Sequence, residues 1–211
     1  MTMEHVKDYL RDARRIIDSF DTIAIEDIAT LIARVRTRKG RIFFAGVGGG
    51  AAHAAHAVCD ARKTAGIEAY AIADNTAELT ARINDEGWNT CYSEWLKASR
   101  MTGKDMLFVF SVGGGDAASA VSVNLVNAVR YAKDKKATVC GILGRDGGFT
   151  ARAATACVIV PVVDRDLVTA HTESFQALIW HLLITHPKVQ MKAMKWESVT
   201  GSGGKRHAPV P

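Results

Sequence analysis

The chain of 211 residues contains only four cysteines, and no two of them form a CxxC pair. They are Cys59, Cys91, Cys140 and Cys157. Because they lie far apart, we expect reduced, buried side chains rather than a disulfide framework or a cysteine metal site. No apolar run approaches the roughly 20 residues of a membrane-spanning helix, and charge from Glu4 onward argues against a secretory signal peptide. The sequence therefore predicts a cytoplasmic protein.

Neither sign of charge is in large excess, since the formal net charge is only +5. Much of the excess lies near the C-terminus, in Lys188, Lys192, Lys195, Lys205 and Arg206. A solvated basic tail accounts for it, so we expect no membrane and no nucleic-acid partner. The chain also lacks a Walker loop and a GxGxxG motif with a suitable acidic partner, which argues against a nucleotide cofactor.

What the chain does have, from position 41 onward, is an alternation of short apolar runs and helical patterns. The apolar runs cover 42–47, 67–73, 106–112, 137–143 and 157–162, and helices are predicted over 50–65, 75–99, 117–133 and 167–185. The runs are nearly continuous rather than alternating, as a parallel sheet covered on both faces requires. The sequence predicts an α/β domain with a five-stranded parallel sheet flanked by helices.

Two amphipathic helices are predicted ahead of the sheet, and Asp21-Thr22 is placed to cap the second of them. With no sheet of their own to cover, they are expected to pack against a partner subunit. We divide the chain into this helical pair at 1–39, a main domain at 40–190 and a mobile C-terminal tail at 191–211. The tail is rich in glycine, serine and proline and shows no periodicity.

Two runs of three glycines, Gly48–Gly50 and Gly113–Gly115, each follow a predicted strand. Glycine permits a positive φ, and a helix that starts there directs its N–H groups and positive dipole end at one spot. Ligands of open parallel sheets bind beyond the carboxyl ends of the strands, where both turns are expected. One such turn is equally compatible with a purely structural role, but two at one edge favour a shared small-anion site.

A second group of chemistry-bearing residues lies on two predicted helices. His56 and Asp60 are four residues apart and therefore share a helix face. In the last helix Glu173 and His181 fall on one stripe, separated by about 12 Å of helical rise. This spacing leaves two interpretations open. His181 is either a ligand or a hydrogen-bonded core histidine, and Glu173 is either a ligand or a carboxylate stabilised by the helix dipole.

Five segments in order resemble a known family, the sugar-isomerase (SIS) domain proteins, and within it the sedoheptulose 7-phosphate (phosphoheptose) isomerase group. The segments are FAGVGGGAAHAAH, NTAELTARINDEGW, SVGGGDAAS, GILGRDGG and TESFQALIWHLL. The resemblance implies a single SIS domain over 40–190 and a homotetramer whose active sites are lined by more than one subunit. It also implies a metal-dependent aldose–ketose isomerase of sugars or sugar phosphates, which moves a proton through an enediol.

The resemblance also implies roles for individual residues. One zinc ion would be held by His56, Asp60, Glu173 and His181. Asp60 would be the catalytic base and His181 the catalytic acid. The substrate would be contacted by Gly48, Gly49, Gly50, Asp85, Ser111, Gly113, Gly114, Gly115 and Asp116. Asp60 replaces a longer glutamate of the family and Glu173 replaces a glutamine, but both side chains offer oxygen ligands that suit zinc.

The two glycine turns depart from the family, because four hydroxyl-bearing residues are replaced here. Asp116 is expected either to place a carboxylate where a phosphate would bind or to cap the following helix. We therefore expect poor turnover of sedoheptulose 7-phosphate. Two alternatives stay open: a non-catalytic SIS-domain protein, similar to the relative that binds the bacterial replication initiator, and a metal-dependent enzyme of other chemistry on this fold.

Overall fold

The computed structural model describes residues 2–200 and shows one sheet of five strands. The strands are β1 (Ile42–Gly46), β2 (Ala69–Ala71), β3 (Met106–Ser111), β4 (Thr138–Leu143) and β5 (Ala156–Ile159). Their order is β2-β1-β3-β4-β5, and every neighbouring pair is parallel. The predicted five-stranded parallel sheet is therefore confirmed.

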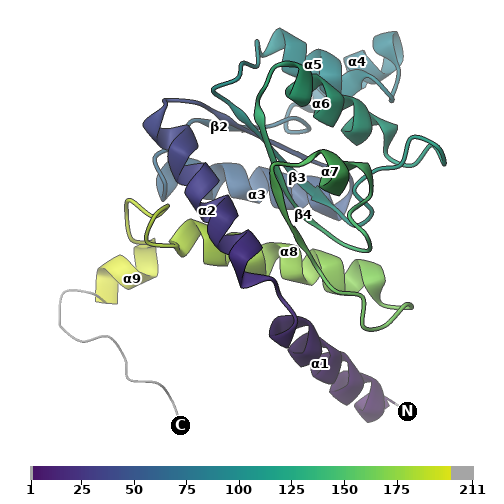
Figure 1. Ribbon diagram of the computed structural model, residues 1–211, viewed down its shortest axis with the longest axis vertical. Coiled ribbons are helices and arrows are strands. Elements are labelled where there is room, and N and C mark those ends of the chain that lie inside the picture. The colour runs from purple at the N-terminus through teal and green to yellow at the C-terminus, as the bar shows by residue number, and fades with distance from the viewer. Residues whose placement is uncertain (1, 201–211) are drawn as a thin grey trace.

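Helices cover both faces of this sheet (Figure 1). They are α1 (Thr2–Asp18), α2 (Thr22–Thr37), α3 (Gly49–Lys63), α4 (Thr76–Glu86), α5 (Cys91–Ala98), α6 (Val123–Asp134), α7 (Gly148–Ala153), α8 (Val168–Thr185) and α9 (Lys195–Thr200). Figure 1 shows α4, α5 and α6 on one side of the sheet and α2, α3 and α8 on the other, while α1 projects away from this body.

Neighbouring side chains of a strand serve the two faces in turn. Phe43 and Phe44 are adjacent on β1, and both are fully buried. Phe44 packs edge-on against Trp180 of α8, with ring centroids 5.2 Å apart, whereas Phe43 packs against Trp95 of α5 at 5.7 Å. Because successive side chains point to opposite faces, a strand covered on both sides must be apolar throughout. This is the origin of the continuous apolar runs in the sequence.

The second helix, α2, packs on the sheet of its own chain and does not need a partner subunit to bury its apolar side. The Asp21 carboxylate accepts hydrogen bonds from the N–H groups of Ile23 and Ala24 and so caps the helix, as predicted. Ile28 and Ile32 have no exposed surface, and α2 contacts β5 and α8. The expectation that both N-terminal helices lack a sheet to cover is wrong for α2, because its apolar stripe closes the core beside the edge strand.

The first helix, α1, behaves differently. Val6, Leu10 and Ile17 recur along one side of it, and each is about half exposed. Two side chains link α1 to the body: Ile16 has no exposed surface and belongs to the core, and the ring of Tyr9 stacks on the buried His171 of α8 with a centroid separation of 4.4 Å. An exposed apolar stripe on a projecting helix is what a contact with another subunit would cover.

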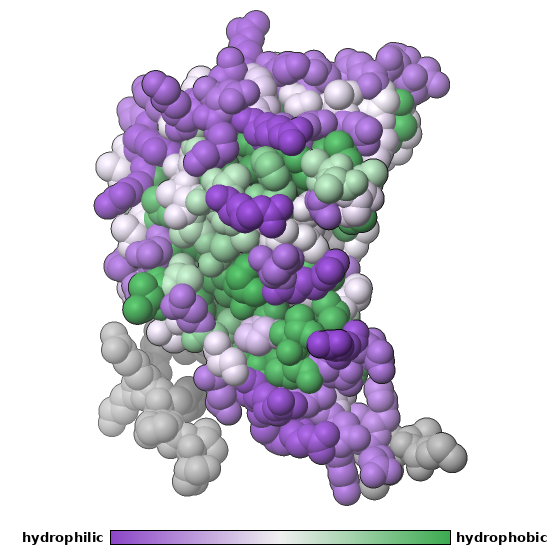
Figure 2. Space-filling view, turned by 45° about the vertical axis from the view of Figure 1, so that its right-hand side comes forward, coloured by the Kyte–Doolittle hydropathy of each residue, from purple (hydrophilic) through white to green (hydrophobic). Residues whose placement is uncertain are grey.

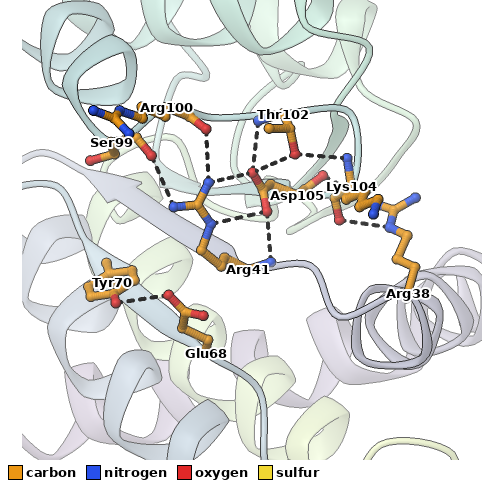
Figure 3. A network of polar contacts seen from close by, with 9 residues as sticks. All are labelled: Arg38, Arg41, Glu68, Tyr70, Ser99, Arg100, Thr102, Lys104 and Asp105. Carbon is orange, nitrogen blue, oxygen red and sulfur yellow. Dashed lines mark hydrogen bonds and ion pairs between the residues drawn. The ribbon is translucent and has the colours of Figure 1, made fainter.

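A polar network fixes the edge of the sheet opposite the glycine turns (Figure 3). Asp105 is 2% exposed and accepts hydrogen bonds from the backbone N–H of Arg41, from its guanidinium and from the N–H of Thr102, each at 2.8–2.9 Å. Burial raises the pKa of Asp105, but these bonds outweigh burial and hold the pKa below its ordinary value. The network ties the start of β1 to the turn that leads into β3.

The helix predicted from position 117 begins six residues later, at Val123. Backbone hydrogen bonds in both directions pair Asp116 with Val121, at 2.8 and 2.9 Å. The Asp116 carboxylate accepts from the N–H of Ala118 and the hydroxyl of Ser119, so this segment closes on itself. Ser122 occupies the N-cap position of α6. The alternative in which Asp116 caps the helix is therefore wrong.

Several smaller expectations have mixed outcomes. Of the four free cysteines, Cys91 and Cys140 are buried as predicted and Cys157 is half-buried, but Cys59 is exposed on α3. In the tail predicted over 191–211, Met191 and Lys192 donate their N–H groups to the Thr64 carbonyl, and 201–211 lie outside the described residues. The division at 39 and 190 stays a prediction. Within residues 2–200, no helix has the length and apolar content of a membrane span.

Candidate active site

The first glycine turn joins β1 to α3, and glycine is required there for two reasons. Gly48 has a φ of +58°, a conformation that side chains disfavour. A Cβ on Gly50 would collide with the carbonyl of Phe110 on the neighbouring strand. At Gly49 a Cβ would stand 2.5 Å from the carboxylate atoms of Glu173. A carboxylate of α8 therefore already faces the positive end of α3.

The second glycine turn, after β3, mainly accepts hydrogen bonds from α7 and so fixes the position of that helix. The Gly114 carbonyl accepts from the N–H and the hydroxyl of Thr150, and the Gly115 carbonyl accepts from the N–H of Phe149 at 2.8 Å. The N–H of Gly114 donates to the Ser111 hydroxyl at 3.0 Å. Two of the three glycines thus serve packing, which leaves Gly113 for a ligand.

A cleft of about 290 Å³ lies where β1 and β3 end, at the edge predicted for ligands. It is lined by Val47, Gly50, Ser111, Val112, Gly113, Val121, Ser122, Arg145, Glu173 and Gln176. Of the predicted substrate contacts, Gly50, Ser111 and Gly113 line it. The other predicted contacts are not among the lining residues: Gly48, Gly49, Asp85, Gly114, Gly115 and Asp116. The roles predicted for these residues stay predictions.

Two polar residues of the cleft were not predicted from the sequence. Arg145 has a left-handed backbone (φ +54°), and its Nη1 lies 3.9 Å from where a Cβ on Gly113 would stand. A basic residue in GRDGG, directly after β4, was the available signal for it. Ser122 is brought to the cleft by the closed segment between Asp116 and Val121. No spacing in the sequence reveals that fold-back.

Three of the four predicted metal ligands come together between α3 and α8. The Nε2 atoms of His56 and His181 are 3.2 Å apart. Oδ2 of Asp60 lies 3.2 Å from the first of these nitrogens and 3.8 Å from the second. The indole N–H of Trp180 donates to the same Oδ2 at 3.0 Å. We call His56, Asp60 and His181 the His–Asp–His cluster.

The His–Asp–His cluster fits a metal ion in both geometry and chemistry. Tetrahedral zinc with ligands at about 2.0–2.1 Å has ligand–ligand edges of about 3.3–3.4 Å. Two of the three separations here, at 3.2 Å, are close to this value, and the third, between Asp60 and His181, is longer at 3.8 Å. Two imidazole nitrogens and a carboxylate oxygen form a common donor set of catalytic zinc sites, which leave one position open. The two histidine side chains are about half exposed, whereas Asp60 is only 14% exposed. The two imidazoles of the cluster therefore face solvent, whereas its carboxylate is largely buried and is held by the hydrogen bond from Trp180.

Glu173, the fourth predicted ligand, is not part of this cluster. Its carboxylate lies against Gly49 at the cleft, eight residues and about 12 Å of rise from His181 along α8. His53 is close to it: burial lowers the pKa of this imidazole, and the negative charge of Glu173 partly opposes the shift. The contact between α3 and α8 (the α3–α8 seam) thus has the cleft near Glu173 and the His–Asp–His cluster further along both helices.

Comparison with known proteins places this architecture. The SIS domain family matches residues 8–144. A phosphoheptose isomerase of Aneurinibacillus thermoaerophilus is 32% identical over 142 residues, 65% of this chain and 68% of that protein. The lincomycin biosynthesis protein LmbN of Streptomyces lincolnensis is 29% identical over 188 residues, 84% of this chain and 66% of that protein. The structure of phosphoheptose isomerase GmhA from Neisseria gonorrhoeae superposes with a TM-score of 0.75 at 25% identity, covering 87% of this chain and 97% of that one.

The parallel sheet, the glycine turns at its carboxyl edge and the helix pair ahead of it define a sugar-isomerase-type α/β domain. This chain belongs to the SIS domain family, and within that family it is phosphoheptose isomerase-like. The resemblance expected from the sequence is confirmed at this level.

Proposed function

We propose that this chain is a metal-dependent aldose–ketose isomerase that acts on sugar phosphates. The observation that carries the proposal is the His–Asp–His cluster, in which three ligand atoms converge at the separations of a tetrahedral metal site. Relatives named phosphoheptose isomerase support the substrate class. A protein of this family that had lost catalysis would have no need to keep these three side chains together.

We place the phosphate of the substrate at the second glycine turn. There the cleft offers the hydroxyls of Ser111 and Ser122, the guanidinium of Arg145 and the N-terminus of α6. Arginine suits phosphate because its planar donors are charged and well matched to phosphate oxygens. The first turn is a poorer place for a phosphate, because the Glu173 carboxylate stands against Gly49 and would repel a second anion.

The position of Asp116 bears on one of the two reasons to expect poor turnover of a phosphorylated substrate, the negative charge. Hydrogen bonds from Ser119 and from the N–H of Ala118 lower the pKa of this carboxyl and hold it inside its own turn. It is not among the residues that line the cleft. Ser122 supplies a hydroxyl, and Arg145 adds a positive charge. We therefore expect phosphate binding despite the lost loop hydroxyls.

Asp60 and His181 are the proposed acid–base pair. Every Asp60 contact described above is made by Oδ2, so Oδ1 is the oxygen that we assign to accept the proton from the sugar carbon. With Nε2 of His181 given to the metal, Nδ1–H is the group that we assign to exchange a proton with the adjacent sugar oxygen, and Asp60 returns its proton to the neighbouring carbon. Zinc bound by His56, Asp60 and His181 would polarise the sugar carbonyl and so acidify the neighbouring C–H. The net result is an enediol formed and collapsed without loss of atoms.

A homotetramer with active sites shared between subunits is part of this proposal. Along α8 the cleft residue Glu173 lies about 12 Å of rise from His181 of the His–Asp–His cluster, so we expect a second subunit to help unite cleft and cluster around one substrate. Leu178 and Leu182 flank the cluster on α8 and are each about 40% exposed. Figure 2 shows apolar side chains gathered in the middle and lower part of one face. A neighbouring subunit covering such surface would bring its own cleft to this cluster.

Zinc content and turnover, measured on the same purified full-length protein, test the proposal. We expect about one zinc per chain and conversion of sedoheptulose 7-phosphate to its aldose isomer, with activity lost on chelation and restored by zinc. Asp60→Asn should abolish turnover, while His53→Ala, on the same helix, should retain most of it. Zinc binding without turnover of any sugar phosphate would point to another chemistry. Neither zinc nor turnover would support the non-catalytic alternative.

A further inference from the structure

Gln176 is a fully buried side chain of α8 that also lines the cleft. Its Nε2 donates to the carbonyl of Ile142 on β4 at 3.1 Å, while its Oε1 has no hydrogen-bond partner. A backbone carbonyl only accepts hydrogen bonds, so the amide atom that faces it must be the nitrogen, which carries the donor hydrogens. The amide oxygen is therefore the end left for another group.

A buried acceptor without a donor is costly, since it has lost the hydrogen bonds that it made in water and gained none in the folded chain. Three other buried polar atoms lack a partner among the described residues: Nδ2 of Asn124 and both ring nitrogens of His171. Neither residue lines the cleft. Gln176 thus combines an unpaired buried acceptor with a position in the wall of the cleft.

We infer that Gln176 is a substrate-binding residue whose amide oxygen accepts a hydrogen bond from a hydroxyl of the sugar. This inference rests on the proposed function, because it takes the cleft to be the substrate site. The two walls of the cleft then have opposite character. Arg145 and Ser122 offer donors to an anion, whereas α8 presents acceptors, the Gln176 oxygen and the Glu173 carboxylate three residues earlier. A phosphate ester that carries free hydroxyls matches both walls.

Recognition of this kind discriminates strongly against a ligand that lacks the hydroxyl. A site built to hydrogen-bond a hydroxyl leaves its own polar group unpaired when the hydroxyl is missing. Glycerol 3-phosphate and propyl phosphate carry the same phosphate on the same three-carbon chain and differ only in hydroxyls. They are therefore the probes of choice, and they require no knowledge of the natural substrate.

The experiment measures the dissociation constants of both probes, and of inorganic phosphate, with the full-length protein and with Gln176→Met. The unsubstituted protein should bind glycerol 3-phosphate at least about tenfold more tightly than propyl phosphate, because propyl phosphate leaves the buried Gln176 oxygen unpaired. In Gln176→Met the preference should fall by about fivefold or more, and the Glu173 carboxylate, which the substitution leaves in place, accounts for any remainder. The affinity for inorganic phosphate should stay within about twofold, because the phosphate end is untouched.

A preference that is undiminished in Gln176→Met would overturn the inference, as would the lack of any preference in the unsubstituted protein. Failure of the unsubstituted protein to bind inorganic phosphate or either ester would instead overturn the proposed function, and with it this inference. Should Gln176→Met not fold, Gln176→Asn keeps an amide but withdraws the oxygen by one methylene. The same collapse of the preference is expected for it.

Discussion

The indole N–H of Trp180 donates a 3.0 Å hydrogen bond to the Asp60 carboxylate, across the seam between α8 and α3. The ring of Trp180 is itself packed edge-on against Phe44, Phe108 and Phe110 of the sheet. The carboxylate of the His–Asp–His cluster is thus oriented by a side chain that the hydrophobic core holds still. Groups of this kind, one step behind a ligand, commonly set metal affinity.

Trp180→Phe should therefore weaken zinc binding by about 10–100-fold, the usual effect of removing a hydrogen bond to a ligand. The phenyl ring retains most of the packing but cannot donate to Asp60. The measurement is a competition titration with a chromophoric chelator. Trp95→Phe, on the opposite face of the sheet, is the matched control and should leave zinc affinity unchanged. Equal affinities in all three proteins would show that the indole does not support the site.

Arg145→Gln should reduce the affinity for inorganic phosphate by about tenfold or more, since a hydrogen bond to a charged group is worth about 1.5–3 kcal/mol. Arg152→Gln removes the same charge from an exposed position on α7 outside the cleft, and should change the affinity by less than about threefold. Isothermal titration in low-salt buffer measures both. A similar loss in the two variants would indicate general electrostatics rather than a site at Arg145.

Asp116→Asn should leave phosphate affinity within about twofold, because the carboxylate is held in its own turn by Ser119 and Ala118. If the carboxylate instead stood where the phosphate binds, which is one of the two alternatives open from the sequence, removing its charge should give a marked gain. The same titration distinguishes the two. A gain of tenfold or more would show that Asp116 reaches the anion after all, and that the segment opens in solution.

Asp105→Asn should lower the free energy of unfolding by about 3 kcal/mol, because it leaves the buried end of the Arg41 guanidinium without its carboxylate. The folded-state pKa of Asp105 is lowered, so its stabilising effect is full above the unfolded-state pKa and is lost as pH falls through the folded-state value. Urea unfolding between pH 7 and pH 2.5 measures this. In Asp105→Asn the unfolding free energy should fall less between pH 7 and pH 2.5, because the contribution of the Asp105 carboxylate is already absent.

Asp8→Asn is the matched control for this network. Asp8 forms an exposed ion pair with Arg11 on α1, and such pairs contribute about 0–1 kcal/mol. It should shift the unfolding free energy little at any pH. Equal effects of the two substitutions would contradict the role given to Asp105.

Leu178→Glu should convert the proposed tetramer into smaller species, because it places a charge in the apolar surface beside the cluster. Light scattering at micromolar concentration checks this against the unsubstituted protein, which should be a tetramer. Ile23→Glu, at an exposed apolar position of α2, is the control. A monomeric unsubstituted protein would contradict the shared active site outright.

Much of the fold could be predicted because each strand carries its own signal. A strand such as Met106–Ser111 is buried on both faces, so its apolar run is visible without knowledge of its neighbours. The cap at Asp21 is equally local. The start of α6 was missed because it depends on backbone pairing between Asp116 and Val121, which no periodicity encodes.

The candidate site divides in the same way. His56 and Asp60 could be paired from their spacing on one helix, and the family resemblance added His181. Arg145 and Ser122 were missed, because their position in the cleft follows from how two loops fold against each other. Glu173 shares a stripe with His181, yet the two serve different levels of the seam. The rise of about 12 Å between them follows from their spacing, but the sequence does not reveal which neighbouring element each side chain faces.

The central claim, a metal-dependent isomerase centred on the His–Asp–His cluster, is tested most directly by elemental analysis coupled to activity. The unsubstituted protein, His56→Ala and His53→Ala are purified identically and assayed with sedoheptulose 7-phosphate before and after zinc addition. We predict about one zinc per chain and zinc-dependent turnover for the first and third proteins, and less than about a tenth of an equivalent with no turnover for His56→Ala. Full zinc content in His56→Ala, or undiminished turnover in metal-stripped unsubstituted protein, would contradict the account.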